Sequence, residues 1–278
     1  MIRNVKRIYN GTISRDGAGV KLNRIFGYYD KEQLDPFLLL DFFDSRNDED
    51  YISGFPWHPH RGIETITYLI KGKIEHQDSL GNSGEINDGD CQWMTAGSGI
   101  IHQEMPKSSE HMFGTQLWLN LPKEHKMTKP VYRDARHDMI KSYNDDKMTV
   151  KVICGQFNGV QGVINGTFVE PVYLDVTIKT NGYFEMETES DKNVFILLLE
   201  GSLIFPRGYM AVASKERGIL LEQGEKVFIE SQAGARFLLI AGKSLHQPIA
   251  WGGPIVMNTR EELELAFNEL DHNTFIKD

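Results

Sequence analysis

Short turn sequences recur along the chain, and their spacing limits the fold to one made of many short strands. Eight of them place a glycine beside an amide, acidic or basic residue: Asn10-Gly11, Asp16-Gly17, Lys71-Gly72, Gly81-Asn82, Asp88-Gly89, Asn181-Gly182, Glu200-Gly201 and Gln223-Gly224. The runs between such turns are short and rich in Ile, Val, Leu, Phe, Tyr and Thr, the residues that favour strands. This combination is typical of sandwiches and barrels, and it predicts an all-β fold.

One strand pattern occurs in each half of the chain. Residues 64–74 (ETITYLIKGKI) have the form of a strand, a glycine turn and a second strand, and residues 193–205 (NVFILLLEGSLIF) share that form. A glycine followed by an acidic residue then leads into another strand in both halves, at Gly89-Asp90 and Gly224-Glu225. A repeated supersecondary unit indicates a repeated domain, so we predict two similar β-domains.

The junction between the two predicted domains is expected near Pro122, Pro130 and the polar segment 142–147, which interrupt the strand pattern. We therefore assign residues 1–130 to an N-terminal domain and residues 131–278 to a C-terminal domain.

One helix is predicted close to the C-terminus and is assigned to the second domain. Asn258 or Thr259 can cap its first turn, where Glu261 and Glu262 follow. An apolar stripe then lies along one helix face, at Leu263, Ala266, Phe267 and Leu270. We expect this stripe to pack on a sandwich.

Charge and cysteine content argue against several classes of protein. The sequence has 30 basic and 39 acidic residues without a dense block of Lys or Arg, which disfavours direct binding to nucleic acid or to an anionic membrane. Cys91 and Cys154 are far apart in strand-like surroundings, so we expect reduced thiols in a reducing compartment. The first residues lack the apolar run of a signal peptide, and no stretch approaches the roughly 20 apolar residues of a membrane span. We therefore expect a cytoplasmic protein.

Two pairs of metal-binding residue types stand about 40 residues apart, His58-x-His60 and His102-x-Glu104. In an extended strand, side chains at i and i+2 project from one face. Either pair alone is more often an accident of the surface or core. Together, on neighbouring strands, they would supply three nitrogens and one carboxylate oxygen. That set suits Fe, Mn, Co, Ni, Cu or Zn with positions left open for substrate or water, whereas Ca²⁺ and Mg²⁺ prefer oxygen ligands.

The other histidines are expected to be solvated or structural. His76 and His111 are the nearest to the two pairs in sequence, and His76, which precedes Gln77-Asp78, is expected in a turn or on the surface. No histidine occurs between Lys141 and Leu245. We therefore expect the second domain to lack a metal and to have a structural role.

Four stretches of the sequence resemble the pirin family, a branch of the cupin superfamily: FPWHPHRGIETITYLIKG, GDCQWMTAGSGIIHQEMP, TQLWLNLP and PIVMNTREELELAF. The resemblance covers most of the chain. It implies two tandem cupin domains, each a double-stranded β-helix or jelly roll, with one metal site in the N-terminal domain that usually holds iron. Carried over position by position, it assigns the metal ligands to His58, His60, His102 and Glu104, with iron(II) as the first expectation for the metal.

Glu64 is an alternative fourth ligand. The ordinary cupin pattern uses a glutamate shortly after His-x-His, and Glu64 occupies that place and shares strand parity with the first histidine pair. We favour Glu104 because it pairs with His102 across one residue and matches the pirin motif. Glu64 would then orient a ligand imidazole or form a salt bridge with Arg61 or another cation.

Three further residues are candidates for the pocket around the metal. Gln116 shares one strand face with Trp118 and Asn120, and we expect it to contact a ligand side chain or the substrate. Asp41, which follows an apolar run, is a similar candidate, although an ordinary sheet hydrogen bond is equally expected for both. Trp57 precedes the first ligand and is expected at the rim, where it would shape access.

The resemblance also implies a function. Pirins are associated with quercetin 2,3-dioxygenase activity, in which a flavonol would bind the metal through its 3-hydroxyl oxygen, with Glu104 as ligand and base. Dioxygen would then open the central ring with release of carbon monoxide. The first expectation is therefore a monomeric oxidoreductase with a flavonol and dioxygen as its partners. The alternative is an iron-binding redox-sensing regulatory protein that binds a transcription factor or enzyme partner without turnover, because mammalian pirins are associated with transcription factors.

Overall fold

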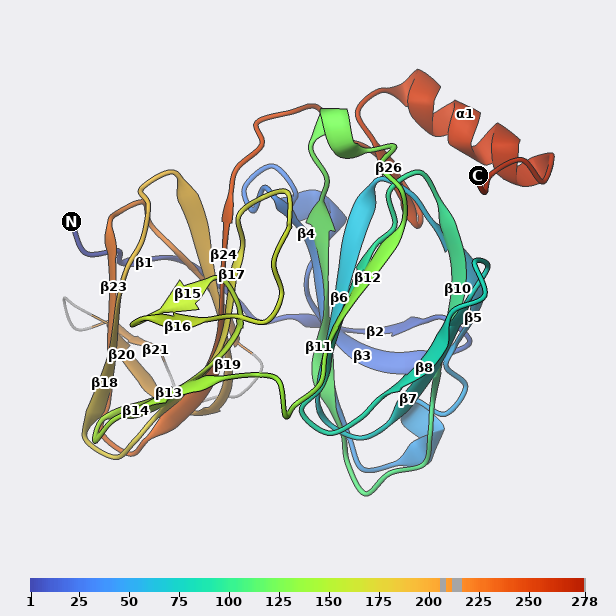
Figure 1. Cartoon of the computed structure of the whole chain (residues 1–278). Helices are drawn as coiled ribbons and strands as arrows, with labels where there is room; N and C mark the ends of the chain where they lie inside the picture. Colours follow the sequence, from blue (N-terminus) through green and yellow to red (C-terminus); the bar gives the residue numbers. More distant parts are fainter. Residues whose placement is uncertain (206–208, 212–216, 278) are drawn as a thin grey trace. The chain divides into compact units, whose positions relative to one another are not determined.

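The computed structural model describes residues 1–205, 209–211 and 217–277, and it confirms the predicted all-β architecture (Figure 1). The chain divides into two compact units. Unit 1 comprises Met1–Gly11, Gln33–Pro36 and Asp138–Ser244, and unit 2 comprises Thr12–Glu32, Phe37–His137 and Leu245–Asp278. Among the described residues, every helix is too short or too polar to span a bilayer.

Unit 2 is built on a seven-stranded sheet in the order β12-β9-β6-β11-β4-β3-β2 and a four-stranded sheet in the order β5-β10-β7-β8. The paired strands in both sheets are antiparallel. The strands are β2 (Thr12–Asp16), β3 (Val20–Phe26), β4 (Phe37–Ser45), β5 (Phe55–His60), β6 (Ile63–Lys71), β7 (Ile74–Asp78), β8 (Ser83–Ile86), β9 (Cys91–Thr95), β10 (Ile100–Pro106), β11 (Met112–Asn120) and β12 (Val131–Ala135). Smaller elements complete the unit: the ribbon of β25 (Ala250–Gly252) and β26 (Ile255–Met257), the 3-10 helices Tyr28–Asp30, Asp48–Asp50 and Lys123–His125, and helix α1 (Arg260–Asp271).

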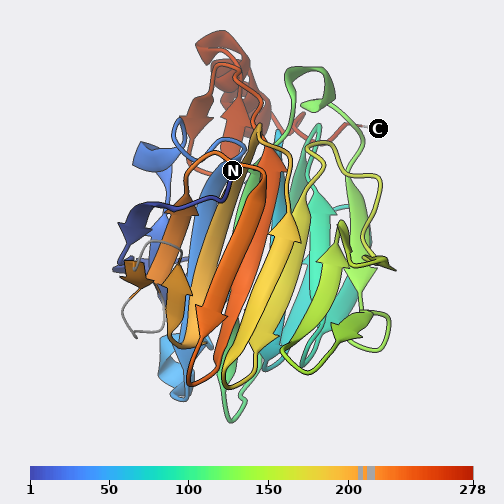
Figure 2. The same cartoon turned by 90° about the vertical axis from the view of Figure 1, so that its left-hand side faces the viewer.

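Unit 1 has the same plan, with a seven-stranded sheet in the order β1-β22-β19-β24-β17-β14-β13 and a four-stranded sheet in the order β18-β23-β20-β21. Figure 2 shows strands of this unit side by side. They are β1 (Val5–Tyr9), β13 (Ser142–Asn144), β14 (Met148–Cys154), β17 (Val172–Ile178), β18 (Gly182–Glu187), β19 (Lys192–Gly201), β20 (Leu203–Phe205), β21 (Tyr209–Ala211), β22 (Arg217–Leu221), β23 (Lys226–Ser231) and β24 (Ala235–Lys243), with a ribbon of β15 (Gln156–Phe157) and β16 (Val160–Gln161).

The compact units group the two chain ends differently from the predicted domains. The division into residues 1–130 and 131–278 stays a prediction, whereas Met1–Gly11 joins unit 1 and the residues from Leu245 onward join unit 2. Strand pairing accounts for the first difference, because β1 pairs antiparallel with β22. Contacts of Arg61 account for the second, because Arg61 forms a β-bridge with Ile255 and a salt bridge with Glu269 of α1.

The predicted turns are present, and the predicted repeat is correct in part. All eight glycine pairs lie at or between strand ends. The strand pair β6 and β7 corresponds to β19 and β20, since the first strand of each pair enters a seven-stranded sheet and the second a four-stranded one. Gly89-Asp90 and Gly224-Glu225 each lead into a strand as predicted, β9 and β23, but these two strands do not correspond. The strand after the first lies beside β6 in the large sheet, whereas the strand after the second, β23, lies in the small sheet.

The C-terminal helix begins where the sequence predicts. Thr259 accepts a hydrogen bond from the Glu262 amide, and the Glu262 carboxylate accepts one from the Thr259 amide, which forms a capping box. Ala266, in the middle of the predicted apolar stripe, is buried in a cluster with Ile255 and Met257 of β26. The helix is therefore fixed by its cap and by one apolar face.

The interiors of the two units differ in polarity. In unit 1 one apolar cluster joins the large and small sheets, and Phe184 of β18 packs edge-on against Phe237 of β24 at 5.6 Å. In unit 2 the apolar residues form separate clusters, and β6 runs from one cluster at Ile63 to another at Leu69. The polar Thr67 is buried between them. Unit 2 therefore has a polar zone in the middle of its interior.

Candidate metal centre

The polar zone of unit 2 continues along β10. Burial alternates on this strand, where Ile100, His102, Glu104 and Pro106 are buried and the residues between them are partly exposed. This alternation places His102 and Glu104 on the inward face. The parity predicted for the His-x-Glu pair is therefore confirmed.

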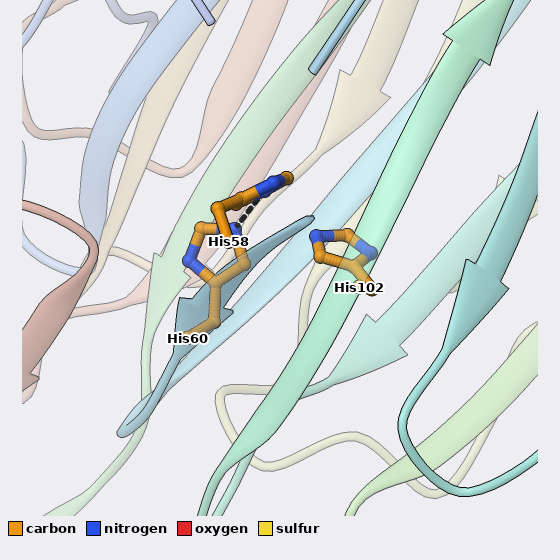
Figure 3. Close-up of side chains that lie close together, drawn as sticks. All are labelled: His58, His60 and His102. Atoms are coloured by element: carbon orange, nitrogen blue, oxygen red, sulfur yellow. Dashed lines mark hydrogen bonds between the residues drawn. The ribbon is translucent and has the colours of Figure 1, made fainter. Parts of the chain in front are cut away.

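His58, His60 and His102 converge inside unit 2 (Figure 3). Strands β5 and β10 pair antiparallel, with His102 opposite His58 and Ile100 opposite His60. One ring nitrogen from each of the three histidines lies within 4.8 Å of the other two. His60 and His102 are buried, and His58 is partly exposed. The pairing of the strands thus brings the two sequence motifs together.

The hydrogen bonds of His58 and His60 determine where their protons lie. The Nδ1 atom of His58 is 2.8 Å from the Pro56 carbonyl oxygen, and that of His60 is 3.1 Å from the Pro254 carbonyl oxygen. A carbonyl oxygen only accepts, so each Nδ1 donates and each neutral ring keeps a lone pair on Nε2. The two Nε2 atoms are 3.1 Å apart. A proton on one of these atoms would form a hydrogen bond to the other (Figure 3), and when both carry lone pairs the separation fits adjacent ligands at about 2.1 Å from one metal ion.

His102 supplies the third imidazole of the group. Both of its ring nitrogens are buried without a hydrogen-bond partner. Burial, together with the charge that neighbouring histidines would carry, lowers the pKa of His60 and of His102 well below 6.5. Both rings are therefore neutral at pH 7 and present lone pairs. Buried nitrogens without partners cost free energy, which a bond to a metal would offset, so this group of residues fits one divalent transition metal.

Glu104 follows His102 on the same face of β10 and is held by residues from two other strands. The Nε2 atom of Gln116 on β11 donates to both carboxylate oxygens, at 3.1 and 3.0 Å, and the Thr67 hydroxyl on β6 donates at 3.2 Å. Trp118 Nε1 donates to Gln116 Oε1 at 3.3 Å, which turns the amide nitrogen of Gln116 toward Glu104. Gln116 therefore contacts a proposed ligand directly, and Trp118 sets its orientation.

Glu64, the other candidate for the fourth ligand, has different partners. Its Oε1 accepts a hydrogen bond from Thr95 at 2.6 Å and lies 3.9 Å from Arg133 Nη1, while its Oε2 is buried without a hydrogen-bond partner. Burial raises the pKa of Glu64, and the Thr95 hydrogen bond and the Arg133 charge oppose that rise only in part. Of the two expected partners for a salt bridge, Arg61 or another cation, the structure has the second in Arg133, while Arg61 pairs with Glu269 at 2.7 Å.

The fourth ligand stays a prediction. In the part of the chain that the structure describes, the group within 4.8 Å contains the three histidines and no carboxylate. Glu104 shares the inward face of β10 with His102, whereas Glu64 lies on β6 in the seven-stranded sheet. These positions favour Glu104.

An open cavity of about 850 Å³ reaches the histidine group. His58 and His60 line it together with Gln116 and Trp118. Most of the remaining wall is apolar or aromatic: Tyr28, Leu39, Phe55, Pro56, Trp57, Trp251 and Pro254. Cavities of this size with a few convergent polar groups are typical of small-molecule sites.

Aromatic rings form a continuous wall that begins at His60. The ring centroids of His60 and Trp118 are 5.0 Å apart, and those of Trp118 and Trp251 are 6.1 Å apart. Tyr28 completes the series, with its centroid 5.5 Å from that of Trp251. Trp57, expected at the rim, lines the cavity and is 52% exposed. A flat aromatic molecule could stack on this wall.

Asp41 lines the same cavity, but its carboxylate is already paired. Arg24 on the adjacent strand β3 donates to both oxygens at 2.9 and 2.8 Å, and it also donates to Asp16 at 2.8 Å. Asp41 stands opposite Gln116 in the register of β4 and β11. The sequence left two alternatives for Asp41, a contact in the pocket or an ordinary bond to a neighbouring strand. Asp41 has the strand partner, Arg24, and both side chains of this ion pair line the cavity.

Three contributors to the site are not predicted from the sequence: Thr67, Trp251 and the carbonyl of Pro254. Thr67 lies between the apolar Ile66 and Tyr68. A polar residue at this position of an otherwise apolar strand could have indicated that Thr67 belongs to the site. Pro254 is 194 residues from His60, and a backbone carbonyl has no signal in the sequence.

The prediction for His76 is wrong. It lies within β7 and is buried, and its ring stacks on Tyr132 with centroids 5.6 Å apart. The strand continues to Asp78 instead of turning after His76, so the side chain enters the interior.

A β-sandwich with a histidine group in its interior that could hold a metal ion is typical of the cupin class. The sequence comparisons give the particular family. Residues 19–119 match the family described as Pirin, and residues 173–276 match the family described as Pirin C-terminal cupin domain. The chain belongs to the pirin family, and its two sandwiches are cupin domains.

Curated relatives match over nearly the whole chain. A "pirin-like protein" of Caulobacter vibrioides is 40% identical over 277 residues, which cover 99% of each chain. A Pseudomonas aeruginosa protein named "putative quercetin 2,3-dioxygenase" is 42% identical over 274 residues, 96% of each chain. Among solved structures, the crystal structure of quercetin 2,3-dioxygenase from Acinetobacter baumannii matches with a TM-score of 0.89 and 28% identity over 99% of each chain.

Proposed function

We propose that this protein is a metal-dependent dioxygenase that opens the central ring of flavonols such as quercetin. One observation carries the proposal: His58 and His60 stand in the wall of a cavity lined by aromatic rings, so a metal held there is within reach of a flat aromatic molecule. The names of the A. baumannii and P. aeruginosa relatives support the same class of reaction.

The three histidines would hold the metal, with Glu104 as the proposed fourth ligand. We propose iron(II), and manganese, cobalt, nickel, copper and zinc are alternatives that suit the same ligand types. A metal held there would lower the pKa of a coordinated hydroxyl, and a redox-active one such as iron would also supply electron transfer between the flavonol and dioxygen.

Glu104 would act as the base that removes the proton of the flavonol 3-hydroxyl. Its carboxylate is buried, and Gln116 and Thr67 hold it in one orientation, which a positioned base requires. A positioned base contributes about 10²–10⁴-fold to a rate. In the overall reaction the flavonol is oxidised by one dioxygen, both oxygen atoms enter the ester product, and carbon 3 leaves as carbon monoxide.

The cavity walls would orient the flavonol. Trp118, Trp251 and Tyr28 offer ring faces and edges for its aromatic rings. The Arg24–Asp41 ion pair offers hydrogen-bonding groups for its other hydroxyls. Both contributions favour a planar polyphenol over an aliphatic substrate.

The proposal is tested by loading metal-free protein with iron(II) under anaerobic conditions, then adding quercetin and air. We expect loss of the flavonol absorbance, with equimolar consumption of dioxygen and release of carbon monoxide. Luteolin, which is quercetin without the 3-hydroxyl group, is the matched control. It should remain unchanged, because it has no 3-hydroxyl proton for Glu104 to remove.

The same assay with manganese, cobalt, nickel, copper and zinc completes the test. Absence of turnover with all six metals would contradict the proposal. A protein partner that is recovered with iron-loaded wild type, but not with a His102→Ala variant, would then support the regulatory alternative.

A further inference from the structure

A second, much smaller cavity adjoins the open one. Its volume is about 20 Å³, and its wall shares Asp41, Phe55 and Gln116 with the wall of the open cavity. Glu104 lines this small cavity, whereas the described residues that line the open cavity do not include it. Glu104 therefore lies where the two cavities adjoin, next to Gln116, which lines both of them.

Most of the small cavity is apolar. The apolar or aromatic side chains in its wall are Val20, Leu22, Phe43, Tyr51, Phe55, Ile74, Pro106 and Met112. Several of them form the buried apolar cluster at one end of the interior of unit 2. The cavity is thus a gap in an apolar core and ends at the polar zone.

The polar side chains in the same wall already have hydrogen-bond partners. Gln116 and Thr67 donate to Glu104, and Arg24 donates to Asp41. Within the described residues, none of these side chains has a buried polar atom left without a partner. The rest of the wall is apolar, so a water in the cavity would have polar partners on one side only, whereas a buried water usually has about two to four.

The volume limits what else could occupy the cavity. About 10–15 Å³ on this measure admits one water-sized molecule, and the cavity exceeds this only slightly. Apolar cavities in proteins stay dry and take up apolar molecules such as xenon. A small apolar gas therefore fits both the size and the chemistry of the wall.

We infer that this cavity holds dioxygen and delivers it to the metal centre. The inference rests on the proposed function, because an oxygen-consuming reaction gives the gas its role at this place. The flavonol enters through the open cavity, and dioxygen is held beside Glu104. The two substrates then approach the centre by separate routes.

Xenon-pressurised crystals of the wild-type protein test the cavity itself, without metal or flavonol. We expect an anomalous peak enclosed by Phe43, Ile74 and Met112, and its absence would overturn the inference. Turnover of quercetin without a xenon site would leave the proposed function standing. A xenon site without turnover would contradict the proposed function alone.

The delivery role is tested by filling the cavity. Val20→Ile adds one methylene group to the wall, and we expect it to remove the xenon peak and to raise the KM for dioxygen about threefold or more. The KM for quercetin and the metal content should not change. Val150→Ile adds the same group to the apolar core of unit 1 and should change none of these quantities.

Loss of the xenon peak in Val20→Ile with an unchanged KM for dioxygen would overturn the delivery role. If melting curves show that this variant does not fold, Leu22→Met repeats the test, because an unbranched side chain of similar volume reaches into the same cavity.

Discussion

His58 Nε2 and His60 Nε2 face each other at 3.1 Å, although the hydrogen bonds at Nδ1 leave a lone pair on each of them. These two side chains, two residues apart on one strand, therefore present two nitrogens that can bind one shared cation. His102 adds a third nitrogen from the paired strand. Pairing of two strands in one register is sufficient to assemble this group.

Replacement of Glu104 by glutamine is expected to lower kcat by about 10²–10⁴-fold. Glutamine keeps the size of the side chain and one oxygen, but it does not take up the flavonol proton. Turnover and metal content are measured on the same preparation. Unchanged turnover at full metal content would exclude Glu104 as the base.

Gln116→Met is expected to lower kcat by about 10–100-fold, because the Glu104 carboxylate loses the donor that fixes both of its oxygens. The KM for quercetin should change little, and the pH profile of kcat should shift if Gln116 acts through Glu104. Gln103→Met is the matched control, since Gln103 lies on the partly exposed face of β10 and bonds to Gln77. Equal losses in both variants would show that Gln116 has no specific role.

Glu64→Gln is expected to stabilise the metal-free protein at neutral pH. Burial raises the pKa of Glu64 above its usual 4.5, so the folded chain holds the proton to a higher pH than the unfolded chain does. Below pH 4.5 both states are protonated and the carboxyl costs nothing. As the pH rises through the raised pKa, the buried carboxylate ionises and stability is lost. The variant should therefore melt higher than wild type at pH 8, and the difference should shrink toward pH 4.5.

The same variant distinguishes the two candidates for the fourth ligand. Glu64→Gln should keep its metal, because Glu64 contacts Thr95 and Arg133. Loss of metal from Glu64→Gln, with full retention in Glu104→Gln, would assign the fourth position to Glu64.

Lys126→Met is expected to lower the free energy of unfolding by about 3 kcal/mol or more. The buried amino group of Lys126, whose pKa burial lowers to about 7, donates to the carbonyl oxygens of Gly62 and Val256 at 2.8 Å and to Asn120 Oδ1 at 2.5 Å. Methionine removes this donor from all three acceptors, and among the described residues only the Gly62 carbonyl keeps another, the Leu121 amide at 3.4 Å. Lys123→Met, at an exposed position three residues earlier, is the control, and equal denaturation midpoints for both variants would contradict this role.

The histidine group could be predicted from the sequence because a strand repeats every two residues. Once the two His-containing segments are strands, parity places His58 with His60 and His102 with Glu104 on common faces. Pairing of β5 with β10 then brings the faces together. The all-β class followed equally directly, because glycine turns and β-favouring runs are local signals.

Contacts between distant segments could not be predicted in this way. Nothing in the sequence of β1 identifies β22 as its partner, because many strands of similar composition could pair with it. The bond from His60 to the Pro254 carbonyl depends on where the β25–β26 ribbon packs. The prediction for His76 failed because the polar residues that follow it are typical of a turn. The interior of unit 2 is polar at this place, so a strand with polar side chains is buried there.

Metal analysis of the purified protein tests the central claim most directly. After loading with iron(II) and removal of free metal, wild type should retain about one equivalent and His102→Ala about a tenth of that or less. His272→Ala, which alters an exposed histidine at the end of α1, should bind as wild type does. A wild-type protein that retains no first-row transition metal, or a His102→Ala variant that retains a full equivalent, would contradict a metal centre built on these three histidines.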